Sequence, residues 1–340
     1  MYSDSDLDAA IEAGVLSRES ANGFRDFVAR RRATPMADEE HFRLLTGFND
    51  IFVTIATLLI LVAAGWLGER IGNGFGGVAV AGLSWALAEY FTRKRRMALP
   101  SLLLLLSFVG GTFVATTATT VSLPMLFAPG GGYQLAGCAA VAAAAAWLHW
   151  RRFMVPITVA AGAGAAILTV TALLVALVPA LRDWGIMPLM LAGGFVAFAL
   201  AMYWDGGDRL RRTRRSDVAF WLHLAAAPMI VHPIFSMLGV IDGGRTGAAA
   251  AFIAVAVYVA LAAVALAVDR RALLVSALIY VFYAISALLQ AAGTPGATSA
   301  LAALVIGSAL LLLSAFWQRA RRPVVALLPP TLRDRLPPVA

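Results

Sequence analysis

From residue 48 onward the chain alternates between long apolar runs and short polar connections. A helix needs about 20 mainly apolar residues to cross a hydrocarbon core of about 30 Å. Ten runs approach that length, at residues 48–68, 71–92, 98–119, 134–150, 153–180, 186–204, 218–240, 248–268, 272–291 and 299–318. The pattern therefore predicts an all-α fold, a polytopic transmembrane helical bundle of ten spans.

The polar segment before the spans, residues 1–47, has the periodicity of two short helices. The first ends at Gly14, and Ser17 can cap the second, whose apolar side includes Phe24 and Phe27. Two helices of this size bury too little surface to form a stable core alone. We predict a cytosolic helix-turn-helix-like hairpin that uses Phe24 and Phe27 to bind a cytosolic partner or a second copy of itself.

The basic residues support this division of the chain. From one end to the other, the polar segments alternate between rich and poor in Lys and Arg, and the rich set holds 24 of the 27 basic residues. Loops rich in Lys and Arg stay in the cytoplasm, so both termini are predicted inside. The segment 319–340 is then a cytosolic Pro/Arg-rich tail. The net charge of +8 indicates topology and attraction to the lipid bilayer, and no nucleic acid is expected as a partner.

Composition excludes several classes of protein. Hydrophobic residues make up 61% of the chain and charged residues 14%, against roughly 25% charged residues in soluble domains. A soluble enzyme and a disordered chain are therefore excluded. The single cysteine, Cys138, excludes an intrachain disulfide and a C-x-x-C site. Lys94 is the only lysine, and this arginine bias, with heavy use of alanine, suggests a GC-rich bacterial genome.

The opening LDAAIEAGVLSRESANGFRDFVARRRA, followed by a long Ala/Leu/Val-rich region, resembles a family of predicted bacterial membrane proteins of unknown function. Members of that family begin with a similar short helix–Gly–helix segment. The resemblance implies an inner-membrane protein with a small cytosolic segment before its spans. It supplies no activity, cofactor or catalytic residue.

Ionisable groups at membrane depth are functional candidates by default, because they are costly there. The seventh span contains His223 and His232, with Pro228 and Pro233 close by. Histidine titrates near neutrality, so a proton relay is conceivable. Nine residues of separation put the two rings on opposite faces of the helix, unless the prolines distort it. The alternative is that each histidine bonds a neighbouring helix at a crossing.

The ninth span carries five polar residues within an arc of about 120° at 100° per residue. They are Ser276, Tyr280, Tyr283, Ser286 and Gln290. Such a face is expected to point into the bundle or a water-filled cavity, as the wall of a substrate or ion pathway. Ordinary hydrogen bonding between helices explains it equally well.

Carboxylates give fewer candidates. Glu89 lies near the end of the second span with Arg93 four residues on, which predicts an ion pair on the helix surface. Asp217 is expected at the start of the seventh span as a cap. We expect no carboxylate deep in the apolar core, and no metal site or cofactor, because no ligand spacing of a known kind occurs.

Three functions fit these patterns. The first is a small-molecule or ion transporter with a polar pathway through spans seven and nine, and the second is a non-catalytic scaffold, sensor or assembly factor. The third is an intramembrane enzyme with His223 or His232 as its base. Such an enzyme needs a second polar group at the same depth, which the sequence does not supply, so the pattern disfavours an enzyme without excluding one.

Overall fold

The computed structural model describes residues 7, 10–24, 48–120, 131–211, 213–239, 248–291, 298–334 and 336–339. Contacts divide the chain into two compact units, one formed by Met1–Arg43 with Ala340 and the other by Leu44–Val339. The regular structure of the described residues is helical. The predicted all-helical fold is confirmed at this level.

The described part of the first unit contains the predicted turn between two helices. Gly14 adopts a left-handed conformation with φ +70°, which glycine adopts without the steric cost that a side chain brings. The second helical stretch begins after Ser17, whose Oγ accepts a hydrogen bond from the Ser20 amide at 3.0 Å. Both details confirm the predicted helix end and helix cap.

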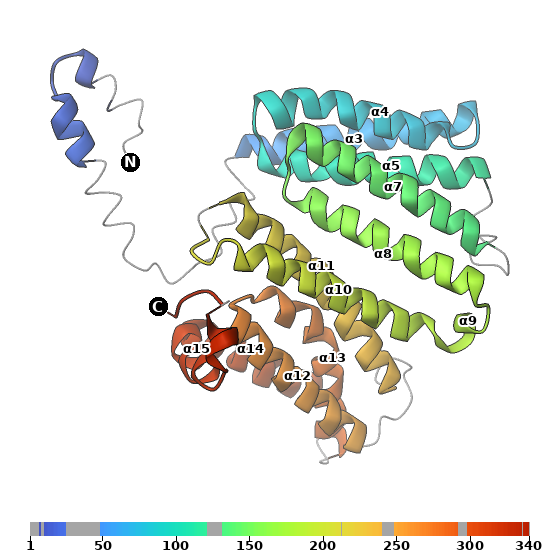
Figure 1. Cartoon of the computed structure of the whole chain (residues 1–340), viewed down its shortest axis with the longest axis vertical. Helices are drawn as coiled ribbons and strands as arrows, with labels where there is room; N and C mark the ends of the chain where they lie inside the picture. The colour runs from blue at the N-terminus through green and yellow to red at the C-terminus, as the bar shows by residue number, and fades with distance from the viewer. Residues whose placement is uncertain are drawn as a thin grey trace. The chain divides into compact units, whose positions relative to one another are not determined.

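Figure 1 shows the helices of the second unit. They are α3 (Phe48–Ile71), α4 (Phe75–Ala88), the π-helix η1 (Glu89–Lys94), α5 (Ala98–Thr120), α7 (Gly132–Phe153), α8 (Ile157–Leu177), α9 (Leu181–Trp184), α10 (Ile186–Gly206), α11 (Arg214–Met237), α12 (Ala248–Val268), α13 (Ala272–Ala291), α14 (Thr298–Ala315), α15 (Trp317–Ala326) and α16 (Pro330–Arg333).

A helix occupies every predicted span. Within the described residues, eight helices are long and apolar enough to cross a membrane: α3, α5, α8, α10, α11, α12, α13 and α14. The second and fourth predicted spans correspond to α4 and α7, which are not among the eight. α4 has 14 residues and continues into the π-helix η1, while the last turn of α7 contains Arg151 and Arg152. The chain is therefore a multi-pass helical protein.

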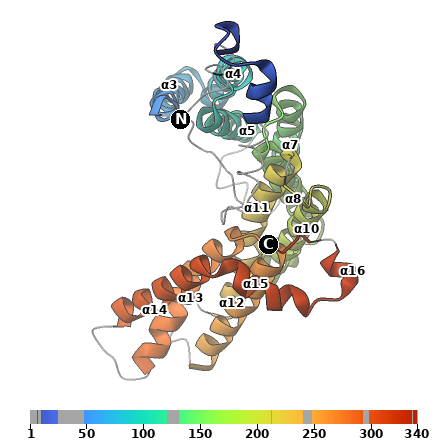
Figure 2. The same cartoon turned by 90° about the vertical axis from the view of Figure 1, so that its left-hand side faces the viewer.

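Helices that follow one another along the chain mostly pack together. α3, α4, α5 and α7 contact in succession, and α12, α13 and α14 form a second group, visible side by side in Figure 2. α11 packs along α10 and also contacts α8 and α13. It is the most buried of the eight apolar helices, with 56% of its span inside the protein. α11 therefore places its side chains against several neighbours at once.

Glycines set the closest approaches between these helices. A Cβ on Gly111 of α5 would lie 2.9 Å from the Gly77 carbonyl oxygen of α4. A Cβ on Gly194 of α10 would lie equally close to the backbone carbonyl carbon of Met229 in α11. Small residues let membrane helices approach until their backbones touch. This close packing holds α10 against α11, where two of the polar side chains below meet.

Candidate functional site

The first polar cluster joins α10 to α11. His223 of α11 is fully buried, and its Nε2 lies 3.3 Å from Oδ2 of Asp205 in the last turn of α10. The imidazole also contacts the ring of Phe198 edge-on, with centroids 5.2 Å apart. His223 thus bonds a neighbouring helix. Its partner is a carboxylate that the sequence had left unassigned.

Arg270 completes this cluster from the connection between α12 and α13. Its Nε and Nη2 donate to the two carboxylate oxygens of Asp205 at 3.2 and 2.5 Å. Nη2 also lies 3.2 Å from the backbone oxygen of Ser216 and 3.3 Å from its Oγ. Both charged side chains are almost wholly buried. A forked arginine–carboxylate pair of this kind fixes geometry as well as charge.

A second cluster surrounds Asp269, the residue before Arg270. Its carboxylate accepts hydrogen bonds from Nη1 of Arg211 at 3.0 Å and from the Trp317 indole N–H at 2.6 Å. Arg321 of α15 brings its Nε within 3.8 Å of the same carboxylate. Asp269 has φ 61°, an uncommon conformation for a residue with a side chain. Its contacts hold this turn in place.

Arg321 also fixes the end of the chain. Its side chain is fully buried, and its guanidinium donates to the carbonyls of Pro338 at 2.8 Å, Pro337 at 2.7 Å and Leu266 at 3.0 Å. Arg209 donates from Nε to the Leu336 carbonyl at 2.9 Å. The part of the predicted tail that the structure describes is therefore bound to the helices by buried arginine.

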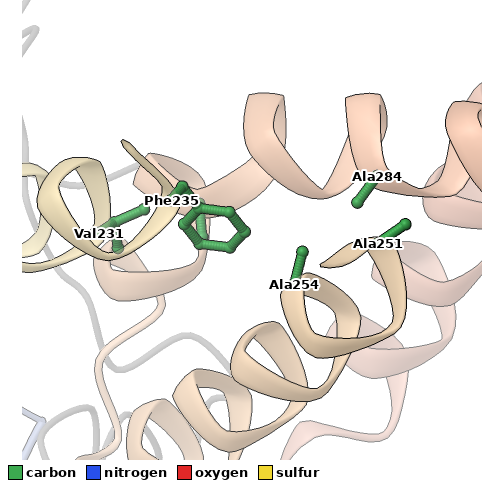
Figure 3. Close-up of a cluster of buried hydrophobic side chains, with 6 residues drawn as sticks. Val231, Phe235, Ala251, Ala254 and Ala284 are labelled. Atoms are coloured by element: carbon green, nitrogen blue, oxygen red, sulfur yellow. The ribbon is translucent and has the colours of Figure 1, made fainter. Parts of the chain in front are cut away.

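His232 has a different partner. Its Nδ1 lies 2.8 Å from the Tyr280 hydroxyl of α13, so the structure brings together two of the residues singled out from the sequence. Tyr280 in turn stacks on Phe235 of α11, with ring centroids 5.0 Å apart. Figure 3 shows the apolar cluster beside this pair, in which Phe235 lies with Ala251 of α12 and Ala284 of α13.

The two histidines do not share a site. His223 is bonded to α10 and His232 to α13, as expected for residues on opposite faces. α11 is one continuous helix from Arg214 to Met237 and includes Pro228 and Pro233 within it.

The polar arc of α13 does not face the bundle as a whole, contrary to expectation. Tyr283, in the middle of the arc, is 57% exposed. The buried face consists of other residues, among them Ala277, Val281 and Ala284. Small residues allow the closest helix contact, so they take the core side of α13. Of the arc residues, Ser276, Tyr280 and Ser286 are half-buried, and Tyr283 and Gln290 are exposed.

The remaining predicted residues are less informative. Phe24 is 41% exposed within its own unit, and Phe27 lies outside the described residues.

Glu89 accepts a hydrogen bond from Arg93 at 3.2 Å, which confirms the predicted pair. It accepts another from Arg152 of α7 at 2.6 Å. The hydrogen bonds to Glu89 raise the pKa of the Arg152 guanidinium. Within the described ranges, His, Cys, Asp and Glu form no group of three that could hold a metal ion.

Sequence reasoning missed Asp205, Asp269, Arg270 and Arg321, because their partners are distant in the sequence. One signal was present. The connection between the eighth and ninth predicted spans has only three residues, Asp269 to Arg271, and all three are charged. Charged residues this close to the helix ends are near enough to bond polar groups of neighbouring helices.

A third histidine, His149 of α7, was also missed. It is fully buried, its Nδ1 lies 3.3 Å from the Thr158 hydroxyl of α8, and its Nε2 has no hydrogen-bond partner among the described residues. The rings of Trp85, Phe108 and Phe153 surround it at centroid distances of 6.2, 5.8 and 4.6 Å. This imidazole is enclosed by aromatic packing.

Chemically, α11 offers two imidazole groups, each bonded to a different helix. His223 belongs to a charged network with Asp205 and Arg270, whereas His232 bonds the phenol of Tyr280. Comparisons of the chain with protein-family models, with curated proteins and with solved structures find no match.

Proposed function

We propose that the protein is a ten-span bacterial inner-membrane protein with both termini in the cytoplasm. The alternation of basic segments supports this topology. Every second connection between spans is rich in Lys and Arg, and such connections stay in the cytoplasm. In this arrangement α4 with η1 and α7 are the two spans beyond the eight apolar helices. Their charged ends, Glu89 and Arg152, bind one another across the two helices.

Within that frame we propose a transporter of a small molecule or ion whose movement is linked to protons. The observation that supports it is the pair of histidines on α11, the most buried apolar helix, each bonded to a different neighbouring helix. Nine residues at 1.5 Å each separate them by about 13 Å along the axis. His223 then lies in the cytoplasmic half of the span and His232 in the outer half.

The contacts suggest how protonation changes the helix packing. Oδ2 of Asp205 lies within hydrogen-bond distance of both His223 and Arg270. A proton on His223 gives the carboxylate a second cation and strengthens the tie between α10 and α11. Loss of that proton leaves Arg270 as the main partner. A cavity of about 590 Å³ lined by Gly206, Asp208 and Arg209 adjoins the end of α10.

Proton flux in proteoliposomes tests the proposal. The full chain is reconstituted with a pH-sensitive dye inside, and a pH step is imposed. We expect faster collapse of the gradient than in empty liposomes, and the empty-liposome rate for the triple variant His223→Ala, His232→Ala, Tyr280→Ala. The matched control is Tyr283→Phe, which alters an exposed tyrosine of α13, the helix that carries Tyr280. Wild-type flux in the triple variant, or no flux in the wild type, overturns the proposal.

A scaffold or assembly factor is the second candidate. It is favoured by the exposed ring of Phe24 in a unit that forms its own compact body. Deleting residues 1–40 separates the two functions. A transporter keeps its proton flux without this unit, whereas a scaffold loses chemical cross-linking to its partner or to a second copy.

A further inference from the structure

A groove lies between the beginning of α13 and the end of α14. Its volume is about 110 Å³, and it is lined by Arg271, Leu274, Val275, Leu278, Leu310, Leu313, Ser314 and Trp317. The lining is divided along its length. Arg271, Ser314 and Trp317 lie at the end where α13 begins and α14 ends, and the other five residues are aliphatic.

The charged end of this groove is built around a tryptophan. The Arg271 guanidinium lies over the Trp317 ring, 5.1 Å from its centroid. Trp317 is 4% exposed, and its indole N–H donates to the buried Asp269 carboxylate at 2.6 Å. The ring is therefore held by the second polar cluster, and it fixes the floor of the groove.

We propose that this groove binds one acyl chain of an anionic phospholipid, with the phosphate held at Arg271. The aliphatic walls match a hydrocarbon chain, and the basic end matches a phosphate at the level of the membrane interface. Basic residues near a membrane surface attract anionic lipid, and interfacial tryptophan lies at headgroup depth. The occupant is a lipid of the surrounding bilayer, because the groove is apolar along the rest of its length.

The site is separate from the two histidine pairs, so it does not depend on the proposed transport. It does touch the network that contains Arg321, because Trp317 lies between the groove and Asp269. A bound lipid thus stabilises the turn at Asp269 from outside.

Native mass spectrometry of the full chain released from nanodiscs tests the proposal. The nanodiscs contain phosphatidylglycerol and phosphatidylcholine in equal amounts, and the lipid that stays bound is counted. We expect retained phosphatidylglycerol to fall about fivefold in Arg271→Gln and to recover in Arg271→Lys. Arg319→Gln is the matched control, because Arg319 is exposed, lies over Phe316 and does not line the groove.

A second variant tests the apolar part. Leu278→Trp fills the groove without changing charge, and we expect it to abolish retention of phosphatidylglycerol while the protein keeps its elution volume in gel filtration. Equal loss in Arg271→Gln and Arg319→Gln would mean general surface attraction and overturn the site. Unchanged retention in both Arg271→Gln and Leu278→Trp, or equal retention of the two lipids by the wild type, would overturn it as well.

Discussion

The two ends of α11 bond their histidines in opposite ways: His223 is fully buried and His232 is half-buried. Near its beginning, His223 lies beside a carboxylate and an arginine whose side chains are almost wholly buried. Nearer its end, His232 meets one phenol beside a cluster of alanine, valine and phenylalanine. Removing one partner of a buried ion pair leaves an uncompensated charge, whereas losing one neutral hydrogen bond between membrane helices costs little. The first pair is therefore a strong tie, and the second is easily opened.

The largest effect is expected at Arg270. Arg270→Met leaves Asp205 buried with His223 as the remaining partner of its carboxylate among the described residues, and loss of one partner costs about 3–5 kcal/mol. The thermal unfolding midpoint of the detergent-solubilised protein reports this loss. Adding Asp205→Leu to Arg270→Met removes the stranded charge and should recover most of the stability. A single variant as stable as the wild type would show that the pair is not buried.

Arg321 is expected to give the next largest effect, at the second cluster. Arg321→Met removes the donors for the Pro337 and Pro338 carbonyls, so the end of the chain loses its anchor. Charged hydrogen bonds contribute about 1.5–3 kcal/mol each, and we expect carboxypeptidase digestion to be at least about tenfold faster. The exposed neighbour Arg322 supplies the control, Arg322→Met. Equal digestion rates for the two variants would contradict the anchor.

The same substitution at both histidines compares the two ends directly. His223→Gln disturbs a carboxylate that is also bound to Arg270, and we expect a loss of about 1–3 kcal/mol. His232→Gln disturbs one neutral contact and should cost about 0.6 kcal/mol. Unfolding midpoints measured side by side give the order. A greater loss of stability in His232→Gln than in His223→Gln would contradict this order.

The smallest effect is expected at the phenol itself. Tyr280→Phe removes the hydroxyl bonded to His232 and should lower stability by about 0.6 kcal/mol. Tyr283→Phe should leave the midpoint unchanged, because Tyr283 is 57% exposed. Identical shifts in the two variants would place the hydroxyl of Tyr280 outside any hydrogen bond.

Apolar run length and turn residues predicted most of the architecture. Each of the ten runs is helical, and Gly14 and Ser17 end and cap helices as expected. These features are local, because a helix depends on neighbours within a few residues. The opposite faces of His223 and His232 follow from the same local geometry.

Partners across helices were harder to predict. The sequence places Asp205 and Arg270 at the ends of two spans. It does not show that the two side chains form an ion pair, because 65 residues separate them. The sequence also did not show that Tyr283 and Gln290 of the α13 arc are exposed. Polarity alone could not orient that helix, since Ala277 and Ala284 allow closer packing than any polar side chain.

Water access to His232 is the most direct test of the central claim that the histidines of α11 lie on a proton-linked transport route. Cys138 is the only cysteine of the chain, so Cys138→Ala gives a thiol-free background for His232→Cys and Tyr283→Cys. Membrane vesicles are treated with a positively charged, water-soluble methanethiosulfonate reagent. The proposed route predicts faster modification at position 232 than at position 283. Modification at 283 with none at 232 would show a dry contact at His232 and contradict the route.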